Sequence, residues 1–318
     1  MSQAIAVPVE QEREDAIRKA RLLMESTVIL DLQFGKVATR KKIDAFDEDV
    51  IETTVERDVL HVSVDLFKSA ELKACFTFMR ALKAQILKKC VPSHFMRGGM
   101  YLVKLEHAQE VDTILEEAIP EFRTLVRAFA DVIDQEREDS KERLGPAYRA
   151  DFFPSREAVL DVFRIEKNWI AVSTPTSLQR VSASFFERER AKAEEHWSTF
   201  TNKVDEMLAA EAKGLCEHLA ERLTPDADGK AKRFKKNSLE SITEYLKNFS
   251  YRNLEGSSAL TKEVARMEKL MEGISPEDLR QNDQLRDSIA KGFSEVAISL
   301  DSYIVKPSRM FALQKEIA

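Results

Sequence analysis

The sequence LGPAYRADFFPSREAVLDVFRIEKNWIAVSTPTSL (144–178) lies between two long helical patterns and decides how the chain reverses direction. It holds one of the two tryptophans, Trp169, and three of the nine prolines, Pro146, Pro154 and Pro175. Proline has a fixed φ and no N–H donor, so it stops a helix or begins one. We therefore expect residues 144–178 to be the joint between two long helices, with Trp169 and Phe163 in a core.

The two patterns that flank this joint have the periodicity of long helices. Ala108–Arg143 keeps one apolar stripe at spacings of three and four residues, although Pro120 lies inside it. We expect either a kink there or two abutting helices. Ser182–Leu223 has no proline and would extend for roughly 60 Å as a helix. Its mixed charges predict a solvated face and antiparallel, coiled-coil-like pairing with 108–143.

The N-terminal region contains the sequence patterns of strands. In Val59–Phe67 apolar and polar residues alternate, which is the period of a half-buried strand. Thr27–Thr39 is rich in β-branched residues, and Gly35 makes it either one strand or two strands with a bend. Ser69–Lys89 has the spacing of a helix. We therefore predict a small antiparallel sheet with a helix beside it.

The C-terminal third is predicted to be a helical bundle. Thr224–Lys236 marks a shift in composition and thus a boundary or loop. Three shorter helical patterns follow, at 238–249, 257–272 and 276–304. The sequence as a whole predicts an α+β protein that is mainly α. Its three predicted regions are an α+β region (1–107), a long helical hairpin (108–223) and a C-terminal helical region (224–318).

The composition suggests a cytoplasmic protein. The 318 residues carry a net charge of -6, which gives no overall attraction to nucleic acid or an anionic membrane. Three cysteines are too few and too scattered for a disulfide framework. The N-terminus lacks the basic and apolar segments of a signal peptide, and no apolar run is long enough to span a membrane.

The known motifs of catalysis and cofactor binding are missing from the sequence. It has no HExxH, CxxC, GxGxxG or GxSxG pattern, and the residues around Gly229-Lys230 depart from a phosphate-binding loop. We therefore expect no catalytic residue, no cofactor and no metal ion. An enzyme remains the third hypothesis, and a deep pocket lined by buried ionisable groups would favour it.

A basic run is the strongest local signal of a binding site. Five cations fall within seven residues with no acid among them: Lys230, Lys232, Arg233, Lys235 and Lys236. One interpretation is a patch that contacts phosphates of nucleic acid, with nearby aromatic residues for stacking. The simpler interpretation is a solvated loop. An acidic protein is another candidate partner, and the acidic stretch 106–142 could itself fill that role.

Several segments resemble a family of uncharacterised bacterial and phage-borne proteins that is classified only as a domain of unknown function. The residues that carry the resemblance are ILDLQFGKVATRKKIDAFDEDV (29–50), DLFKSAELK (65–73), VPSHFMRGGMYLV (91–103), RLGPAYRADFFPS (143–155) and GKAKRFKKNSLESITEYLKNFSYRNL (229–254). Members of that family are often encoded beside MoxR-type AAA+ ATPases and von Willebrand factor A-type proteins. The resemblance implies a component or client of an ATPase assembly on a phage or mobile element, and it implies no catalytic residue.

Together these observations favour a non-enzymatic interaction protein. The long solvated helices predict protein partners or self-association, and the resemblance adds an AAA+ ATPase as a partner. The alternative is a nucleic-acid-binding module that uses Lys230–Lys236.

Overall fold

The computed structural model of the protein describes residue 18 and residues 21–43, 62–92, 98–174, 176–225, 237–254 and 258–304. The chain forms two compact units. Unit 1 consists of Met1–Val28, Val103–Leu105 and Ala171–Ala318, and unit 2 consists of Ile29–Leu102 and Glu106–Ile170. The protein is α+β and mainly helical, as predicted.

These units differ from the three predicted regions 1–107, 108–223 and 224–318. The patterns at 108–143 and 182–223, which we expected to pair as a hairpin, fall into different units. The two patterns do not pair because a strand follows the first of them. Residues 165–171 form this strand in the N-terminal sheet, so the segment that contains 108–143 folds together with that sheet.

The main sheet has four strands in the order β4-β5-β1-β6. They are β1 (Thr27–Phe34), β4 (Val91–Pro92), β5 (Met100–Lys104) and β6 (Ile165–Ala171). The predicted antiparallel sheet is confirmed. A separate two-stranded sheet pairs β2 (Arg40–Ile43) with β3 (Val62–Asp65) in antiparallel register. Within the pattern at 27–39 the structure has one strand, β1, which ends just before Gly35; residues 35–39 are not a strand, and β2 begins only at Arg40.

Two glycines permit close backbone contacts around β1. The Gly35 N–H donates to the Arg164 carbonyl at 2.9 Å, and a Cβ on Gly35 would come within 2.0 Å of the Val162 carbonyl oxygen. Gly99 has φ +96°, and its carbonyl accepts the Leu32 N–H at 2.8 Å. Side chains are disfavoured at both positions, so glycine sets how closely the segments flanking β1 approach it.

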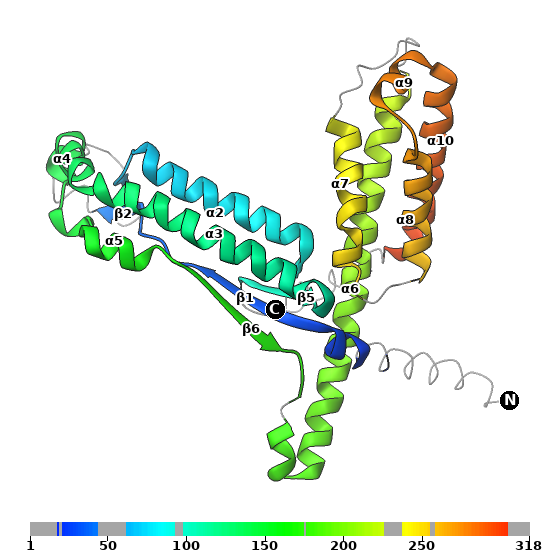
Figure 1. Ribbon diagram of the computed structural model, residues 1–318, viewed down its shortest axis with the longest axis horizontal. Helices are drawn as coiled ribbons and strands as arrows, with labels where there is room; N and C mark the ends of the chain where they lie inside the picture. The colour runs from blue at the N-terminus through cyan, green and yellow to red at the C-terminus, as the bar shows by residue number, and fades with distance from the viewer. Residues whose placement is uncertain are drawn as a thin grey trace, which may run out of the picture. The chain divides into compact units, whose positions relative to one another are not determined.

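Unit 2 contains two long helices, α2 (Ala70–Lys89) and α3 (Leu105–Asp131), and the shorter α4 (Ile133–Leu144) follows α3 (Figure 1). Ser69 caps α2 by accepting the Leu72 N–H, as expected of a serine before a helical pattern. The pattern at 108–143 does form two abutting helices. The break lies at Val132, however, and Pro120 is accommodated inside α3.

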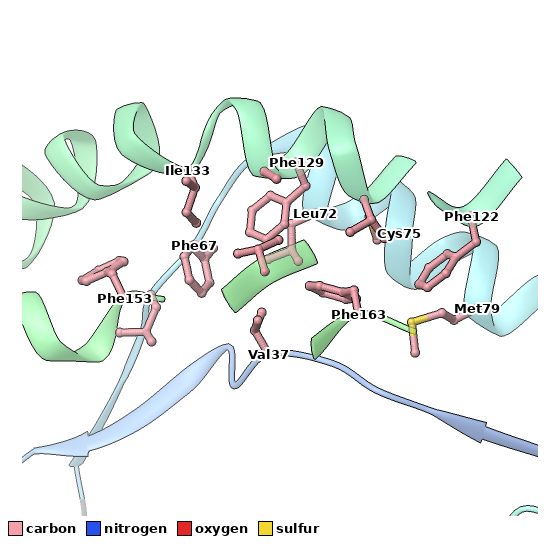
Figure 2. Close-up of a cluster of buried hydrophobic side chains, with 14 residues drawn as sticks. Val37, Phe67, Leu72, Cys75, Met79, Phe122, Phe129, Ile133, Phe153 and Phe163 are labelled. Atoms are coloured by element: carbon pink, nitrogen blue, oxygen red, sulfur yellow. The ribbon is translucent and has the colours of Figure 1, made fainter. Parts of the chain in front are cut away.

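The core of unit 2 is a cluster of aromatic rings contributed by segments far apart in sequence (Figure 2). Phe129 on α3 meets Phe67 at 5.6 Å and Phe163 at 5.9 Å between ring centroids, both edge to face. Phe153 meets Phe67 at 5.5 Å. Each such ring pair stabilises a fold by about 0.5–1.5 kcal/mol in addition to the free energy gained from burying its apolar surface. The cluster therefore attaches the joint to the helices.

Residues 144–178 end one long helix and lead to the next. Gly145 stops α4 with φ +51°, and short helices follow: η2 (Gly145–Ala147), η3 (Ala150–Phe152), α5 (Arg156–Val162) and η4 (Thr176–Arg180). Phe163 is buried in the core as expected, whereas Trp169 is half-buried. The Trp169 indole N–H donates to Asp112 on α3 at 2.8 Å, so the tryptophan fixes β6 to that helix.

Unit 1 is a helical bundle around one long helix (Figure 1). Its helices are α6 (Ala183–Leu223), α7 (Asn237–Arg252), α8 (Ser258–Met271), α9 (Pro276–Gln281), α10 (Asp283–Leu300) and η5 (Asp301–Tyr303). Within the unit, α6 packs against α7, α8 and α10 and against the short helices η4 and η5. We predicted one helix over 276–304. Instead Asn282 has an extended backbone and caps α10, which divides that segment into α9 and α10.

Candidate functional site

The basic run predicted as a binding site, Lys230, Lys232, Arg233, Lys235 and Lys236, lies outside the described residues. In the described part of the chain, no group of three or more histidine, cysteine or acidic side chains could hold a metal ion. None of the described helices is apolar over a length that would cross a bilayer.

The three cysteines have the environment of structural thiols. Cys75, Cys90 and Cys216 are all free and buried. Burial raises the pKa of Cys75 to about 11 and that of both Cys90 and Cys216 to about 12. The thiolate is the nucleophilic form. At neutral pH these side chains therefore act as small apolar groups of the cores.

A groove of about 600 Å³ in unit 2 combines positive charge with an apolar floor. We call it the basic groove, and its lining is Phe34, Lys36, Lys73, Phe76, Met79, Arg80 and Lys83. Local structure explains how these residues meet. β1 ends at Phe34, and Lys36 lines the groove two residues later in the chain. On α2, spacings of three and four residues place 73, 76, 80 and 83 along one side of the helix.

No described acidic residue neutralises the charge of the basic groove. The described residues of its lining include no carboxylate, and all four cations are exposed. Among the described residues none of the four has an ion pair, and the one side-chain bond is from Arg80 to the Thr77 hydroxyl at 3.3 Å. Arg80 and the three lysines thus form a local excess of positive charge in a chain whose net charge is -6.

The floor of the basic groove is continuous with the core of unit 2. Met79 is 9% exposed and belongs to the buried cluster, and Figure 2 shows its side chain beside those of Phe122 and Phe163. The Phe76 ring contacts the Phe163 ring at 6.1 Å between centroids. Phe34 is also packed on the cluster and is only partly buried. The floor is therefore held in place from below, while part of each phenylalanine ring faces the groove.

Cations beyond the lining extend this charged surface. α2 carries five cations, Lys73, Arg80, Lys83, Lys88 and Lys89, against the single acid Glu71. Lys89 is paired with Glu110 at 2.7 Å, so the far end of α2 is partly neutralised. Among the described residues, the cations without an ion pair are therefore concentrated on the first four turns of α2 and on the segment after β1.

Other cavities combine both signs of charge. One of about 450 Å³ lies between α3 and the joint, and its described lining contains Arg123, Arg127 and Arg164 beside the carboxylate of Asp161. That carboxylate would repel an anion, and the described lining of the basic groove has none. Another, of about 370 Å³ in unit 1, contains the buried Glu194.

Glu194 is held by two arginines. Its carboxylate lies 2.7 Å from Arg21 Nε and 3.6 Å from Arg190 Nε. The hydrogen bond and charge of Glu194 raise the pKa of Arg21. We interpret this group as a structural ion pair that fixes the helical residues 21–26 to α6. The basic groove consequently remains the best candidate site.

Comparison with family models, with curated proteins and with solved structures found no match. The resemblance to a domain of unknown function and the ATPase partner that it implies therefore stay predictions. The assignment of a site must come from the geometry and charge of the chain itself.

The basic groove was missed in the sequence because its cations are not adjacent. A search for runs of charge finds Lys230–Lys236, whereas Lys73, Arg80 and Lys83 are separated by helical spacing. The signal that was present is the charge balance of one helix, with five cations and one acid in α2. A helical projection of 70–89 places three of those cations on the side of Phe76.

Proposed function

We propose that this chain is a non-enzymatic interaction protein that binds an anionic partner in the basic groove. The observation that supports this most is the set of exposed cations Lys36, Lys73, Arg80 and Lys83 around an apolar floor without a carboxylate in the lining. An anionic partner would neutralise this charge and cover the floor at the same time.

The chemistry of the lining favours binding over catalysis. The basic groove offers ammonium and guanidinium groups, two phenylalanine rings and a thioether, and its lining has no carboxylate, histidine or thiol. General acid–base catalysis requires a group that gains and loses a proton near neutral pH. Positive charge attracts partners and accelerates their encounter, and burial of apolar surface adds affinity.

The test is a capture experiment with two variants of equal charge change. The groove variant is Lys73→Glu, Arg80→Glu, Lys83→Glu, and the control variant is Lys203→Glu, Arg222→Glu, Lys291→Glu, which changes exposed cations of unit 1. We expect polyanionic partners to be captured by the wild type and the control variant and lost by the groove variant. Circular dichroism checks that both variants fold. Equal capture by both variants would disprove the proposed site.

Two further proposals come from the sequence. The first is that Lys230–Lys236 binds nucleic acid. Replacement of Lys232, Arg233 and Lys235 by alanine should then weaken binding and its salt dependence. The second is assembly with protein partners, including an AAA+ ATPase, in the cytoplasm. A purified protein that stays monomeric and does not bind the products of neighbouring genes would contradict it.

A further inference from the structure

We infer that the anionic partner of the basic groove is single-stranded nucleic acid, bound with little sequence preference. This inference rests on the proposed function and specifies the partner. Proteins that bind single strands combine a positively charged groove along the backbone with aromatic side chains on which bases stack. The basic groove contains both features on one face of unit 2.

The cations form a track along the protein surface. Lys73 and Lys83 are ten residues apart on α2, with Arg80 between them, which corresponds to roughly 15 Å at the helical rise. Lys36 adds a fourth cation from the segment after β1. A linear anion with regularly spaced charges neutralises such a track better than a compact anion does. Each phosphate that contacts a cation releases counterions, which favours binding.

The aromatic rings Phe34 and Phe76 provide surfaces for stacking. Their contacts with the core hold both rings in place, so little side-chain freedom is lost when a base stacks on them. Stacking requires unpaired bases, which excludes an intact duplex from the floor of the groove.

The lining offers little to distinguish one base from another. Its described residues include no asparagine, glutamine, serine, threonine or carboxylate, so among them Arg80 and the lysines supply the side-chain hydrogen bonds. Base recognition depends mainly on such paired donors and acceptors. Contacts from cations and phenylalanine rings tolerate any base. We therefore expect homopolymers of different bases to bind with similar affinity.

An acidic peptide fits the basic groove less well. β1 lies between β5 and β6 in the sheet, so its backbone groups are already paired and a peptide strand cannot add to it. Recognition of a peptide helix needs an apolar floor that takes anchors over two or more turns. Here the apolar lining consists of Phe34, Phe76 and Met79, and the remaining four residues are cations.

Fluorescence anisotropy tests the inference with three labelled probes: a 20-nucleotide oligo(dT), a 20-base-pair duplex and a 20-residue poly-glutamate. For single strands, log K falls with log salt by about 0.7 per phosphate contacted. The four cations of the groove therefore predict a slope of about −2.8 for oligo(dT), or roughly 50-fold weaker binding at 200 mM than at 50 mM salt. A 20-nucleotide oligo(dA) should give a similar affinity.

Three variants locate the interaction. The triple groove variant Lys73→Ala, Arg80→Ala, Lys83→Ala has one cation left in the described lining. Its salt slope for oligo(dT) should fall to about −0.7, so that its affinity drops only roughly 2.6-fold between 50 and 200 mM salt. The control Lys203→Ala, Arg222→Ala, Lys291→Ala should keep the wild-type slope. Phe76→Leu keeps an apolar side chain and should weaken binding about 5-fold or more at every salt concentration without changing the slope.

The outcomes separate the inference from the proposed function. If poly-glutamate binds more tightly than oligo(dT), and the groove variant loses that binding, the site is real and the partner is an acidic protein. If the groove variant binds oligo(dT) like the wild type, both the inference and the site are wrong. The same conclusion holds if replacement of Lys232, Arg233 and Lys235 by alanine abolishes oligo(dT) binding, because the basic run and not the basic groove would then be the site. A wild type that binds no probe also overturns both.

Discussion

Replacement of Phe129 by alanine tests the aromatic core that supports the basic groove. The Phe129 side chain is completely buried and has edge-to-face contacts with Phe67 and Phe163. Truncation removes about 120 Å² of buried apolar surface, or about 3 kcal/mol at 25 cal/mol per Å². The two lost ring contacts add about 0.5 kcal/mol each. We therefore expect the free energy of unfolding to fall by about 4 kcal/mol, whereas Phe129→Leu should cost about 1–1.5 kcal/mol.

The assay is urea unfolding followed by tryptophan fluorescence in a Trp197→Phe background. Trp169 lies in unit 2 and Trp197 in unit 1, so the remaining tryptophan reports on the unit that contains Phe129. Arg127→Ala changes an exposed side chain of the same helix and should alter stability by less than about 0.5 kcal/mol. A loss below about 1.5 kcal/mol for Phe129→Ala, or equal losses for alanine and leucine, would refute the assignment of an aromatic core.

Three further predictions concern other parts of the structure. Gly35→Ala should lower the free energy of unfolding by about 2 kcal/mol, because the new Cβ would meet the Val162 carbonyl oxygen; a neutral effect in urea unfolding would contradict this contact. The Lys167 ammonium and the Trp169 indole hold the pKa of Asp112 below its usual value. The ionised Asp112 therefore stabilises the folded state above about pH 4. This contribution is lost as the pH falls through the lower pKa that Asp112 has in the folded state. Asp112→Asn should therefore be less stable than wild type at pH 7, and a gap that persisted at pH 2 would argue against this. Finally, the buried cysteine thiols should resist a thiol reagent at pH 8 in the native protein and react fully in denaturant, whereas rapid native labelling would show that they are accessible.

The ends of helices and the turns were predictable where a residue type, such as serine before a helix or paired glycines in a turn, strongly favours one local structure. Ser69 before an apolar stripe predicted the start of α2. The glycine pair Gly98-Gly99 is likewise a local turn signal, and Gly99 adopts positive φ just before β5. In both cases the signal is local, because the cap or turn is satisfied within three residues. The class of the fold followed from the same patterns.

The arrangement of these elements was not predictable, since it depends on contacts across long stretches of sequence. The strand β6 covers Ile165–Ala171, within the stretch that we expected to be a joint between helices, and its residues alternate between half-buried and exposed up to Ile170. Nothing in that sequence specifies β1 as its neighbour. The predicted pairing of the two long helical patterns was reasonable from their lengths, yet β6 places the first pattern in unit 2. The basic groove was hidden for the same reason, because β1 and α2 contribute to it together.

The order of the two units along the chain has a consequence for synthesis. Arg21 and Glu194 form their ion pair across a separation of 173 residues, and both main segments of unit 2 lie between them. At about 5–20 residues per second, the ribosome needs roughly 10–35 s to make the second partner after the first. During that interval the whole of unit 2 is made, while residues 21–26 still lack the helix against which they pack. The unit that contains the basic groove is therefore complete first, and it could hold its partner before the rest of the chain has been made.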